Sequence, residues 1–346
     1  MNNEKTRYDY LPFSKQIADS FCALPFAQLV FTPSGRVAPC CLIQDFYVGD
    51  VQTRSVDEIW NGNEIKSLRH EFLTGKIHTC KMLQEHKQCH RQHDRLLPHI
   101  SPQEHCEKKP ARLDLRLNSQ CNLSCQMCQT WRGSNNTYIE NNFIKNFETE
   151  LLPYAKEINM LGGEPFIQKS TFEILKIASK VNPSCLWAFS TNLNIDVNLA
   201  LSHLEKIRIS RIQVSIDSLE EKTYQKIRKG GSLKVLLGNL DKLIKFRETY
   251  KNRTGENFRL QGAMCIQRDN WREIPQFLDF CHDKGLNANL QFAYTPVSVT
   301  LSLLDRREKD EIIDYLLDYA EGDNAIYLKP ILAALADDAS ALQLEE

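Results

Sequence analysis

From about residue 112 onward the sequence alternates short strand-like runs with longer helical runs, and this repeat constrains the fold more than any other feature. The predicted strands are RLDLRL (112–117), EINMLGG (157–163), LWAFSTN (186–192), RIQVSID (211–217), FRLQGAMCI (258–266) and ANLQFAY (288–294). The segments between them are amphipathic. Six such alternations predict parallel βα units, and hence an α/β fold whose strands form a partial, six-stranded, open barrel of the TIM type. The functional loops of such a barrel lie at the C-terminal ends of the strands.

The chain after the sixth predicted strand has a helical pattern. DRREKDEIIDYLLDYAEG (305–322) has the periodicity of an amphipathic helix, and the alanine-rich end of the chain predicts one more helix. We therefore expect the open barrel over residues 109–300 and a C-terminal helical extension over residues 301–346.

The first third of the chain has a different pattern and predicts a small α+β cysteine-rich module over residues 1–108. FAQLVFTPSGRVAPCC (26–41) predicts two short strands joined by a turn that contains Pro and Gly. Ser55 and Glu58 have the spacing of a capping box at a helix start, and Gly75 is expected to end the next helix.

The composition is that of an ordinary globular protein, with 346 residues, 42% of them hydrophobic and 25% charged. A formal net charge of -1 argues against a nucleic-acid binder or a membrane-surface protein that depends on global charge. The N-terminal sequence has no apolar signal segment, and no run approaches the ~18 apolar residues of a membrane span. We expect a cytoplasmic protein with neither nucleic acid nor membrane among its partners.

Twelve cysteines are many for a reducing compartment, where clustered cysteines are better interpreted as metal ligands than as disulfides. Three of them stand alone in the sequence: Cys185, Cys265 and Cys281. Cys281 continues an apolar helix face, and Cys265 lies in a predicted strand. We expect both to be small core residues.

A short segment after the first predicted strand, NSQCNLSCQMCQTW (118–131), places Cys121, Cys125 and Cys128 within eight positions. A structural zinc site would require a fourth protein ligand. A four-iron cluster has four corners, and three thiolates leave its fourth iron free to bind another molecule. The spacing therefore predicts an open iron–sulfur cluster.

This CxxxCxxC loop after a strand of a βα-repeat protein resembles the radical S-adenosylmethionine (SAM) superfamily, over roughly residues 112 to 295. In that family the second strand ends in a glycine-rich turn whose backbone and acidic side chain receive the methionyl ammonium group. The matching sequence here is LGGEPF, with Gly162, Gly163 and Glu164. Glycine suits a place where a ligand approaches the backbone closely.

The resemblance extends to the ends of the third and fourth strands, where relatives bind the ribose and methionine portions of SAM. The matching positions are Ser190, Asn192, Ser215 and Asp217. Arg228 stands where many relatives place a cation near the cofactor's carboxylate, and a solvated helix-end arginine is the alternative. Met127 stands where relatives often carry an aromatic residue that packs on adenine, and methionine can pack similarly.

The resemblance also implies the chemistry. SAM, held on the cluster through its methionine amine and carboxylate, would accept an electron and split into methionine and a 5′-deoxyadenosyl radical that abstracts a substrate hydrogen. The protein would orient the reactants, exclude water and supply electrons. A one-electron reductant such as flavodoxin or ferredoxin is the implied partner.

The N-terminal module resembles the SPASM/twitch cluster-binding extension of these enzymes. The likeness depends on Cys22, Gly35 and Cys40 at the spacing of that motif, although the usual close CxxC pair is absent and Cys41 competes with Cys40. The favoured ligands of one auxiliary iron–sulfur cluster are Cys22, Cys40, Cys80 and Cys89. Zinc, with His90 or His93, is the alternative, because seven of the nine histidines lie between His70 and His105.

Two classes of function remain in competition. The favoured function is a radical SAM enzyme that acts on a peptide or protein side chain, and a small molecule such as a sugar or nucleoside derivative is the alternative substrate. The competing class is a non-catalytic iron–sulfur electron carrier or scaffold. That class gives no reason for LGGEP, STN and SID to stand at the strand ends.

Overall fold

The computed structural model describes residues 6–43, 46–80, 89–130 and 143–336. The strands are β1 (Gln28–Phe31), β2 (Arg36–Ala38), β3 (Gly49–Asp50), β4 (Arg112–Leu115), β5 (Glu157–Met160), β6 (Leu186–Thr191), β7 (Arg208–Ser215), β8 (Arg259–Ile266) and β9 (Asn287–Phe292). The α-helices are α1 (Arg7–Tyr10), α2 (Lys15–Ser20), α3 (Leu24–Ala27), α4 (Val56–Trp60), α5 (Asn63–Thr74), α8 (Lys169–Val181), α9 (Val197–Leu204), α10 (Glu221–Ile227), α11 (Leu233–Thr254), α12 (Ile274–Asp283), α13 (Arg306–Leu317) and α14 (Ala325–Ala336). The 3-10 and π segments are η1 (Cys89–His99), η3 (Phe147–Leu151), η4 (Pro165–Ile167), η5 (Trp271–Glu273) and η6 (Gly322–Asn324).

One mixed sheet organises the described chain, with the strand order β3-β2-β1-β4-β5-β6-β7-β8-β9. The six strands predicted from residue 112 onward are present as β4 to β9, and each is parallel to its neighbour. The sheet is larger than the six strands predicted, because it has nine. The additional strands come from the N-terminal segment: β1 pairs parallel with β4, and β2 and β3 continue antiparallel. All four residues of β1 are buried, so pairing on both edges satisfies backbone groups that water cannot reach.

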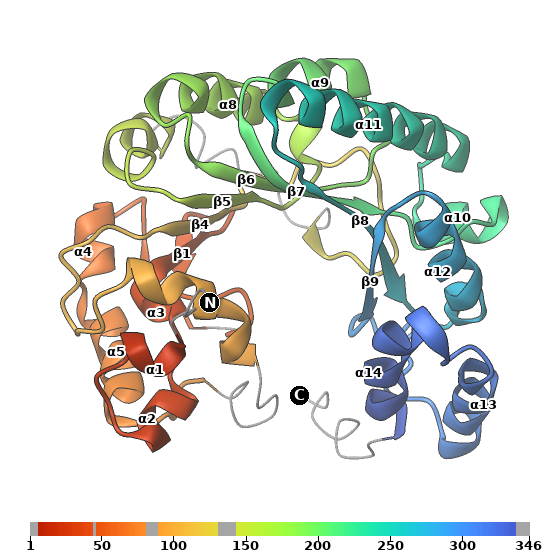
Figure 1. Cartoon of the computed structure of the whole chain (residues 1–346), viewed down its shortest axis with the longest axis horizontal. Coiled ribbons are helices and arrows are strands. Elements are labelled where there is room, and N and C mark those ends of the chain that lie inside the picture. Colours follow the sequence, from red (N-terminus) through yellow and green to blue (C-terminus); the bar gives the residue numbers. More distant parts are fainter. Residues whose placement is uncertain (1–5, 44–45, 81–88, 131–142, 337–346) are drawn as a thin grey trace.

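The sheet is curved, and helices cover its convex side (Figure 1). Residues alternate along the central strands between buried apolar and half-buried polar, as in β7 and β8. The apolar face packs on helices α8, α9, α11 and α12. The opposite face carries a row of side chains from three neighbouring strands, Ser190, Gln213 and Gln261, which the register places side by side. Parallel strands are usually apolar on both faces, so the concave face is built for polar contacts.

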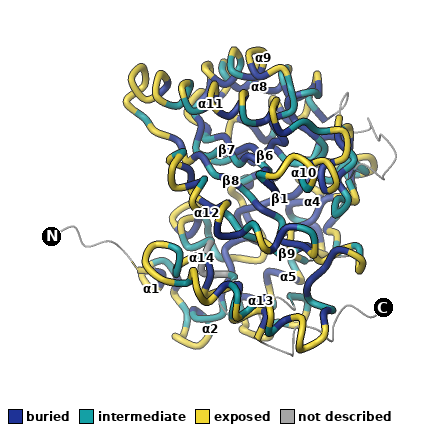
Figure 2. Tube along the Cα trace, turned by 90° about the vertical axis from the view of Figure 1, so that its right-hand side faces the viewer, coloured by how far each residue is buried: buried dark blue, intermediate teal, exposed yellow. Residues whose placement is uncertain are grey.

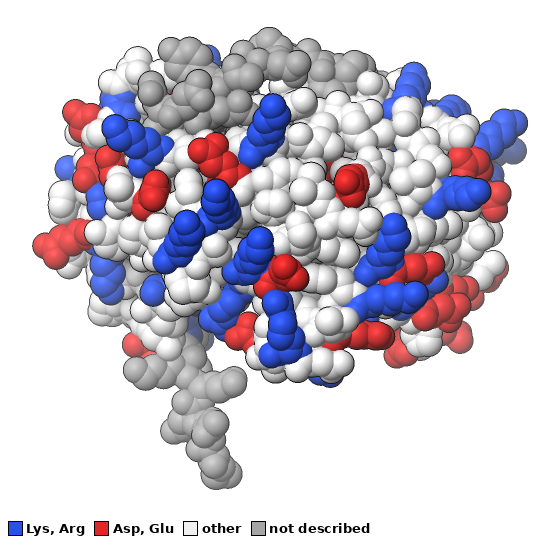
Figure 3. Space-filling view, turned by 90° about the horizontal axis from the view of Figure 1, so that it is seen from above, with Lys and Arg blue, Asp and Glu red and all other residues white. Residues whose placement is uncertain are grey.

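The outer surface of the helical layer is exposed, whereas the strands beneath it are buried (Figure 2). Seen from above, that surface carries side chains of both signs (Figure 3). A surface of mixed sign agrees with a net charge of -1. No described helix is long and apolar enough to cross a membrane.

The N-terminal segment has the local structure that its sequence predicts. β1 and β2 form a hairpin whose Gly35 has φ +88°. Ser55 and Glu58 form a capping box at the start of α4, and Gly75 ends α5 at φ +71°. Left-handed backbone at these two glycines costs other residues strain, which explains their place.

A buried arginine holds this N-terminal segment together. Arg69 on α5 donates from Nε to the Pro25 carbonyl at 2.9 Å and from Nη1 to the Glu104 carbonyl at 2.8 Å. Its guanidinium lies 4.3 Å from the centre of the Trp60 ring. Trp60 in turn donates to the Lys108 carbonyl at 2.9 Å. The segment that leads into β4 is therefore fixed by side chains of α4 and α5. At the other end of the chain, α13 and α14 pack on each other, and α14 contacts β9.

Candidate functional site

The loop with three cysteines begins directly after β4 and is held by backbone hydrogen bonds to the segment that follows α10. Ser124 N donates to the Lys229 carbonyl and Gln126 N donates to the Ile227 carbonyl, each at 2.9 Å. Cys125 is buried, while Cys121 and Cys128 are half-buried. The loop therefore has a path fixed by the end of α10, which lies about 100 residues further along the chain.

The thiols of the loop are close enough for their neighbours to affect the ionisation of Cys121 and Cys125. The pKa of Cys125 is raised to about 11, chiefly by burial, with Arg228 lowering it and the charges of Asp217, Cys128 and Cys121 contributing to the rise. Burial also raises the pKa of Cys121, with a contribution from Cys128. Thiolates at this place require a positively charged partner. Within the described ranges, no group of three or more His, Cys, Asp or Glu side chains is arranged to hold a single metal ion.

Two side-chain N–H donors point at these sulfurs. Arg228 donates from Nη1 to Cys125 Sγ at 3.7 Å, and Asn192 donates from Nδ2 to Cys121 Sγ at 3.7 Å. Leu123 N also donates to Cys121 Sγ, at 3.5 Å. Hydrogen bonds to sulfur are a feature of iron–sulfur sites. The donor set and its surroundings thus fit a cluster better than a single zinc ion.

The glycine-rich turn after β5 packs directly on the start of the cysteine loop. Gly162 and Gly163 both have left-handed backbone, at φ +79° and +57°. A Cβ added at Gly163 would lie 2.1 Å from the carbonyl oxygen of Gln120. Glu164 N donates to the same carbonyl at 2.9 Å. The close approach in this structure is therefore made by the residue before Cys121.

Glu164 is buried, and donors of its own chain occupy its carboxylate. Thr191 Oγ1 donates to Oε1 at 2.8 Å, Asn192 N donates to Oε2 at 2.6 Å, and Phe166 N donates to Oε1 at 3.2 Å. Burial raises the pKa of Glu164 to about 7, although these hydrogen bonds and the charge of Arg228 lower it. The carboxylate thus fastens the end of β5 to the end of β6. Contact with the methionyl ammonium group stays a prediction.

Asparagines organise the end of β6. Asn192 Nδ2 also donates to Asn122 Oδ1 at 2.9 Å, and Asn122 Nδ2 donates to the Asn194 carbonyl at 2.6 Å. Asn194 continues the network to the hydroxyl of Tyr224 at 2.8 Å. The loop after β6 is therefore tied to the cysteine loop and to α10 by side-chain amides.

The ends of β7 and α10 meet at a buried ion pair. Arg228 Nη2 lies 2.8 Å from Asp217 Oδ2, and their side chains are only 8% and 1% exposed. Asp217 has φ +65° and accepts a hydrogen bond from Cys265 N at 2.7 Å. Burial of Arg228 excludes the alternative of a solvated helix-end arginine. The predicted role of the pair in binding SAM is not tested by this geometry.

Three other predicted residues lie near this centre. Ser190 and Ser215 are half-buried on β6 and β7, and Met127 is half-buried in the turn between the second and third cysteines. Cys265 is not the core residue predicted from its strand. It is half-buried, and its pKa is affected by Asp217, Arg228, Cys125 and Cys128. Residues of β8 alternate between buried and less buried positions, and Cys265 falls at a less buried one, whereas the prediction rested only on its place in a strand. Cys281, by contrast, is buried as predicted.

Sequence reasoning missed the side chains that support the loop from the end of β8. Gln126 Nε2 donates to Gln267 Oε1 at 2.7 Å and to Asp269 Oδ2 at 3.0 Å. Lys226 Nζ lies 2.6 Å from Asp269 Oδ1. For Gln267 and Asp269, only the position just after a predicted strand could have suggested this role.

Cysteines of the N-terminal segment form a second group. Burial raises the pKa of Cys22 to about 12, with further contributions from Cys80 and Cys89. Cys40 shares a hydrogen bond with Cys41, and its ionisation is also affected by Cys22. Burial raises the pKa of Cys89, and the charges of Cys80 and Cys41 contribute to the rise.

The structure therefore brings the four predicted auxiliary ligands and Cys41 into one region. Residues 81–88 and the side chain of His90 lie outside the described part of the chain. Cys106 does not belong to this group. Burial raises its pKa and Arg69 lowers it, and no other thiol is among the causes of the shift.

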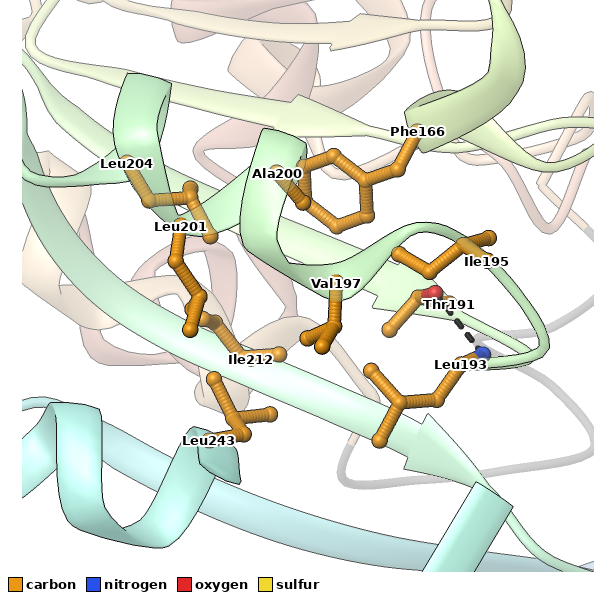
Figure 4. Close-up of a pocket in the computed structure, with 10 residues that line it drawn as sticks. All are labelled: Phe166, Thr191, Leu193, Ile195, Val197, Ala200, Leu201, Leu204, Ile212 and Leu243. Atoms are coloured by element: carbon orange, nitrogen blue, oxygen red, sulfur yellow. Dashed lines mark hydrogen bonds between the residues drawn. The ribbon is translucent and has the colours of Figure 1, made fainter. Parts of the chain in front are cut away.

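A small apolar gap lies between the outer helices and the sheet (Figure 4). Its lining residues are Phe166, Thr191, Leu193, Ile195, Val197, Ala200, Leu201, Leu204, Ile212 and Leu243. The lining comes from β6 and the loop after it, from α9, β7 and α11, and from the turn after β5. It belongs to the core beneath the helices and offers no polar group for a cofactor beyond Thr191, which is bonded to Glu164.

Comparison with known proteins gives two family matches. The radical SAM superfamily matches residues 116–281, and the iron-sulfur cluster-binding domain SPASM matches residues 22–91. The first stretch contains the three-cysteine loop and the ends of β5 to β8. The second contains Cys22, Cys40, Cys41, Cys80 and Cys89.

Similar curated proteins include a probable GTP 3′,8-cyclase of Methanocaldococcus jannaschii, 29% identical over 50% of this chain and 55% of the relative. Another is the tungsten-containing aldehyde ferredoxin oxidoreductase cofactor-modifying protein of Pyrococcus furiosus, 25% identical over 62% of this chain and 58% of the relative. The chain thus spans little more than half the length of these curated relatives. Among solved structures, Streptococcus suis SuiB bound to S-adenosylmethionine aligns with a TM-score of 0.44 and 19% identity, over 74% of this chain and 57% of SuiB.

Proposed function

The chain is a member of the radical SAM superfamily that carries a SPASM iron-sulfur cluster-binding domain, and on this premise we propose that it is an enzyme that activates a substrate C–H bond. The family implies a 4Fe–4S cluster and SAM, and the SPASM domain implies auxiliary iron–sulfur clusters. The observation that carries the proposal is the meeting of the three-cysteine loop, the Gly162–Glu164 turn and the ends of β6 and β7 at one place. The contacts of Gln120 with Gly163, Cys121 with Asn192 and Cys125 with Arg228 join them.

Cys121, Cys125 and Cys128 would hold three irons of the cluster, and its fourth iron would be left for SAM. When bound, the cluster and SAM together supply a 5′-deoxyadenosyl radical that removes one hydrogen atom from the substrate. The side chains of this protein would position the groups that take part in this reaction. Arg228 and Asn192 orient the cysteine sulfurs, and the turn after β5 fixes the start of the loop.

The polar side chains on the concave face of the sheet favour a polar substrate. Gln213 accepts a hydrogen bond from Asn289 at 2.9 Å, and Arg211 donates to Asn159 at 3.3 Å. The carbonyl end of the Gln261 side chain is buried and has no hydrogen-bond partner among the described residues. Side-chain amides on neighbouring strands can match the alternating donors and acceptors of a peptide.

The SPASM match also favours a peptide or protein side chain as substrate, because many relatives with this extension modify peptides. A small molecule is the second candidate, since the M. jannaschii relative is named as a probable GTP 3′,8-cyclase. That similarity covers only 50% of this chain. A one-electron reductant such as flavodoxin or ferredoxin completes the proposal.

Anaerobic reconstitution with iron and sulfide tests the enzyme assignment. With a reductant and SAM, the loaded protein should release 5′-deoxyadenosine, and replacement of Cys121, Cys125 and Cys128 by alanine should abolish the release. An electron carrier would release none. Mass spectrometry of deuterium transferred to 5′-deoxyadenosine from labelled peptides or labelled nucleotides then separates the two substrate classes.

A further inference from the structure

Arg228 touches a cluster ligand and a carboxylate with two different nitrogens. Nη1 donates to Cys125 Sγ at 3.7 Å, and Nη2 lies 2.8 Å from Asp217 Oδ2. All three side chains are buried. A buried cation is costly unless it is paired; here the Asp217 carboxylate offsets its desolvation, and the Cys125 thiolate would do so as well when a cluster is bound.

The ion pair is rigidly mounted. Asp217 Oδ1 accepts a hydrogen bond from Cys265 N at 2.7 Å, and the Asp217 carbonyl accepts one from Asn270 Nδ2 at 2.7 Å. Arg228 N donates to the Tyr224 carbonyl at 2.7 Å and caps α10. Both ends of the pair are therefore fixed by the backbones of β8 and α10. The ion pair with Asp217 holds the guanidinium beside the sulfur.

This inference depends on the proposed function: we propose that Arg228 is a positioning residue that raises the reduction potential of the three-cysteine cluster, and that Asp217 limits the rise. Reduction transfers one electron from the one-electron reductant, which is oxidised, to the cluster, which gains a negative charge. A cation that donates to a coordinating sulfur stabilises the more negative state. The carboxylate at 2.8 Å partly cancels that effect.

The two members of the pair should therefore shift the potential in opposite directions. Arg228→Gln removes the cation and should lower the equilibrium constant for reduction about tenfold, which is about 59 mV for one electron. Asp217→Asn removes the balancing anion and should raise the potential. Asparagine suits this position, because the φ of +65° is one that Asn tolerates as Asp does.

Lys226→Gln is the matched control. It removes one positive charge from α10 two residues from Arg228, but the Lys226 side chain is 62% exposed and pairs with Asp269. Solvent screens such a charge, so the potential should change little. Arg228→Lys keeps the charge with a shorter reach and should lie between the wild type and Arg228→Gln.

The experiment is a redox titration of the reconstituted full chain under anaerobic conditions, followed by electron paramagnetic resonance. The relevant signal is the one lost when Cys121, Cys125 and Cys128 are replaced by alanine. If the wild type gives no such signal, the proposed function fails. If the signal exists, either of two results overturns the inference. One is an equal shift of its potential in Arg228→Gln and Lys226→Gln. The other is a shift of the same sign in Arg228→Gln and Asp217→Asn. Should Arg228→Gln not assemble the cluster, the signs measured for Arg228→Lys and Asp217→Asn decide in the same way.

Discussion

Gly163 and Gln120 are in direct contact: a Cβ built on Gly163 would lie 2.1 Å from the Gln120 carbonyl oxygen. This contact joins the turn after β5 to the residue that precedes Cys121. The same carbonyl accepts hydrogen bonds from Glu164 N at 2.9 Å and from Gln168 Nε2 at 3.2 Å. The position of the first cysteine therefore depends on a backbone contact that no side chain larger than hydrogen permits.

Gly163→Ala should destabilise the protein more than an ordinary glycine substitution in left-handed backbone. Gly255 is the matched control, because its φ is +72° and a Cβ there meets nothing within 4 Å. Gly255→Ala should cost about 1 kcal/mol of unfolding free energy from strain alone. Gly163→Ala should cost a further 1 to 3 kcal/mol, roughly the cost of overpacking. Urea unfolding measures both, and equal losses would contradict a steric role for the Gln120 contact.

The raised pKa of Glu164 predicts a pH dependence of stability. Its ordinary pKa is 4.5, and burial raises it to about 7 in the folded protein. The folded state thus holds its proton more tightly than the unfolded state does. The associated stability is fully present below pH 4.5 and is lost as the pH rises through 7, by about 3 kcal/mol in total. The free energy of unfolding of wild type minus that of Glu164→Gln should therefore fall between pH 5 and pH 8.

Glu71→Gln is the control for this pH series. Burial acts to raise the pKa of Glu71, but hydrogen bonds from Thr79 and His78 lower it below its ordinary value overall. A lowered pKa affects stability only at acid pH, so the difference between wild type and Glu71→Gln should be flat from pH 5 to pH 8. A flat difference for Glu164→Gln as well would show that the Glu164 carboxylate titrates normally.

Arg69 should be the most sensitive charged residue of the N-terminal segment. Arg69→Met leaves the Pro25 and Glu104 carbonyls without their donor and removes the contact at 4.3 Å with Trp60. A loss of about 3 to 5 kcal/mol in unfolding free energy is expected. Arg54→Met is the control, because Arg54 makes an ion pair with Glu64 at the surface and should cost less than about 1 kcal/mol. If Arg69→Met and Arg54→Met lose similar amounts of unfolding free energy, the buried contacts of Arg69 do not hold the N-terminal segment together.

Local patterns predicted most of the strands and helices, because their signals lie within a few residues of one another. The six strands from β4 to β9, the capping box at Ser55 and the helix stop at Gly75 are examples. The pairing of Gln28 with Arg112, which extends the sheet, joins residues far apart in the chain. No periodicity in either segment encodes that partner.

The candidate site shows the same limit. The spacing of Cys121, Cys125 and Cys128 predicted a cluster-binding loop because the three cysteines lie within eight positions of the sequence. The contact of Arg228 with Cys125 could not be predicted, since it arises only when the end of α10 folds back onto the loop. The role of Glu164 between β5 and β6 likewise depends on Thr191 and Asn192, which lie on a different strand.

The last prediction concerns the second group of thiols. Cys80 and Cys89 affect the ionisation of Cys22, Cys80 and Cys41 affect that of Cys89, and Cys41 and Cys22 affect that of Cys40. We predict that this group holds one auxiliary cluster, saturated by Cys22, Cys40, Cys80 and Cys89. The variant without Cys121, Cys125 and Cys128 should then retain about four irons per chain after reconstitution. Further loss of Cys22 and Cys80 should remove them.

Cys106→Ala is the matched control for this count, because Cys106 is buried in the same segment but interacts with Arg69 rather than with the thiols. It should leave the iron content unchanged. Cys40→Ala and Cys41→Ala compared side by side identify the fourth ligand, and only the ligand's removal should lower the iron content. If the variant lacking Cys121, Cys125 and Cys128 contains stoichiometric zinc and no residual iron, and active wild type also contains zinc, the second group of thiols is a zinc site and holds no auxiliary cluster. The enzyme assignment would survive that outcome, because it depends on the loop after β4 and not on these thiols.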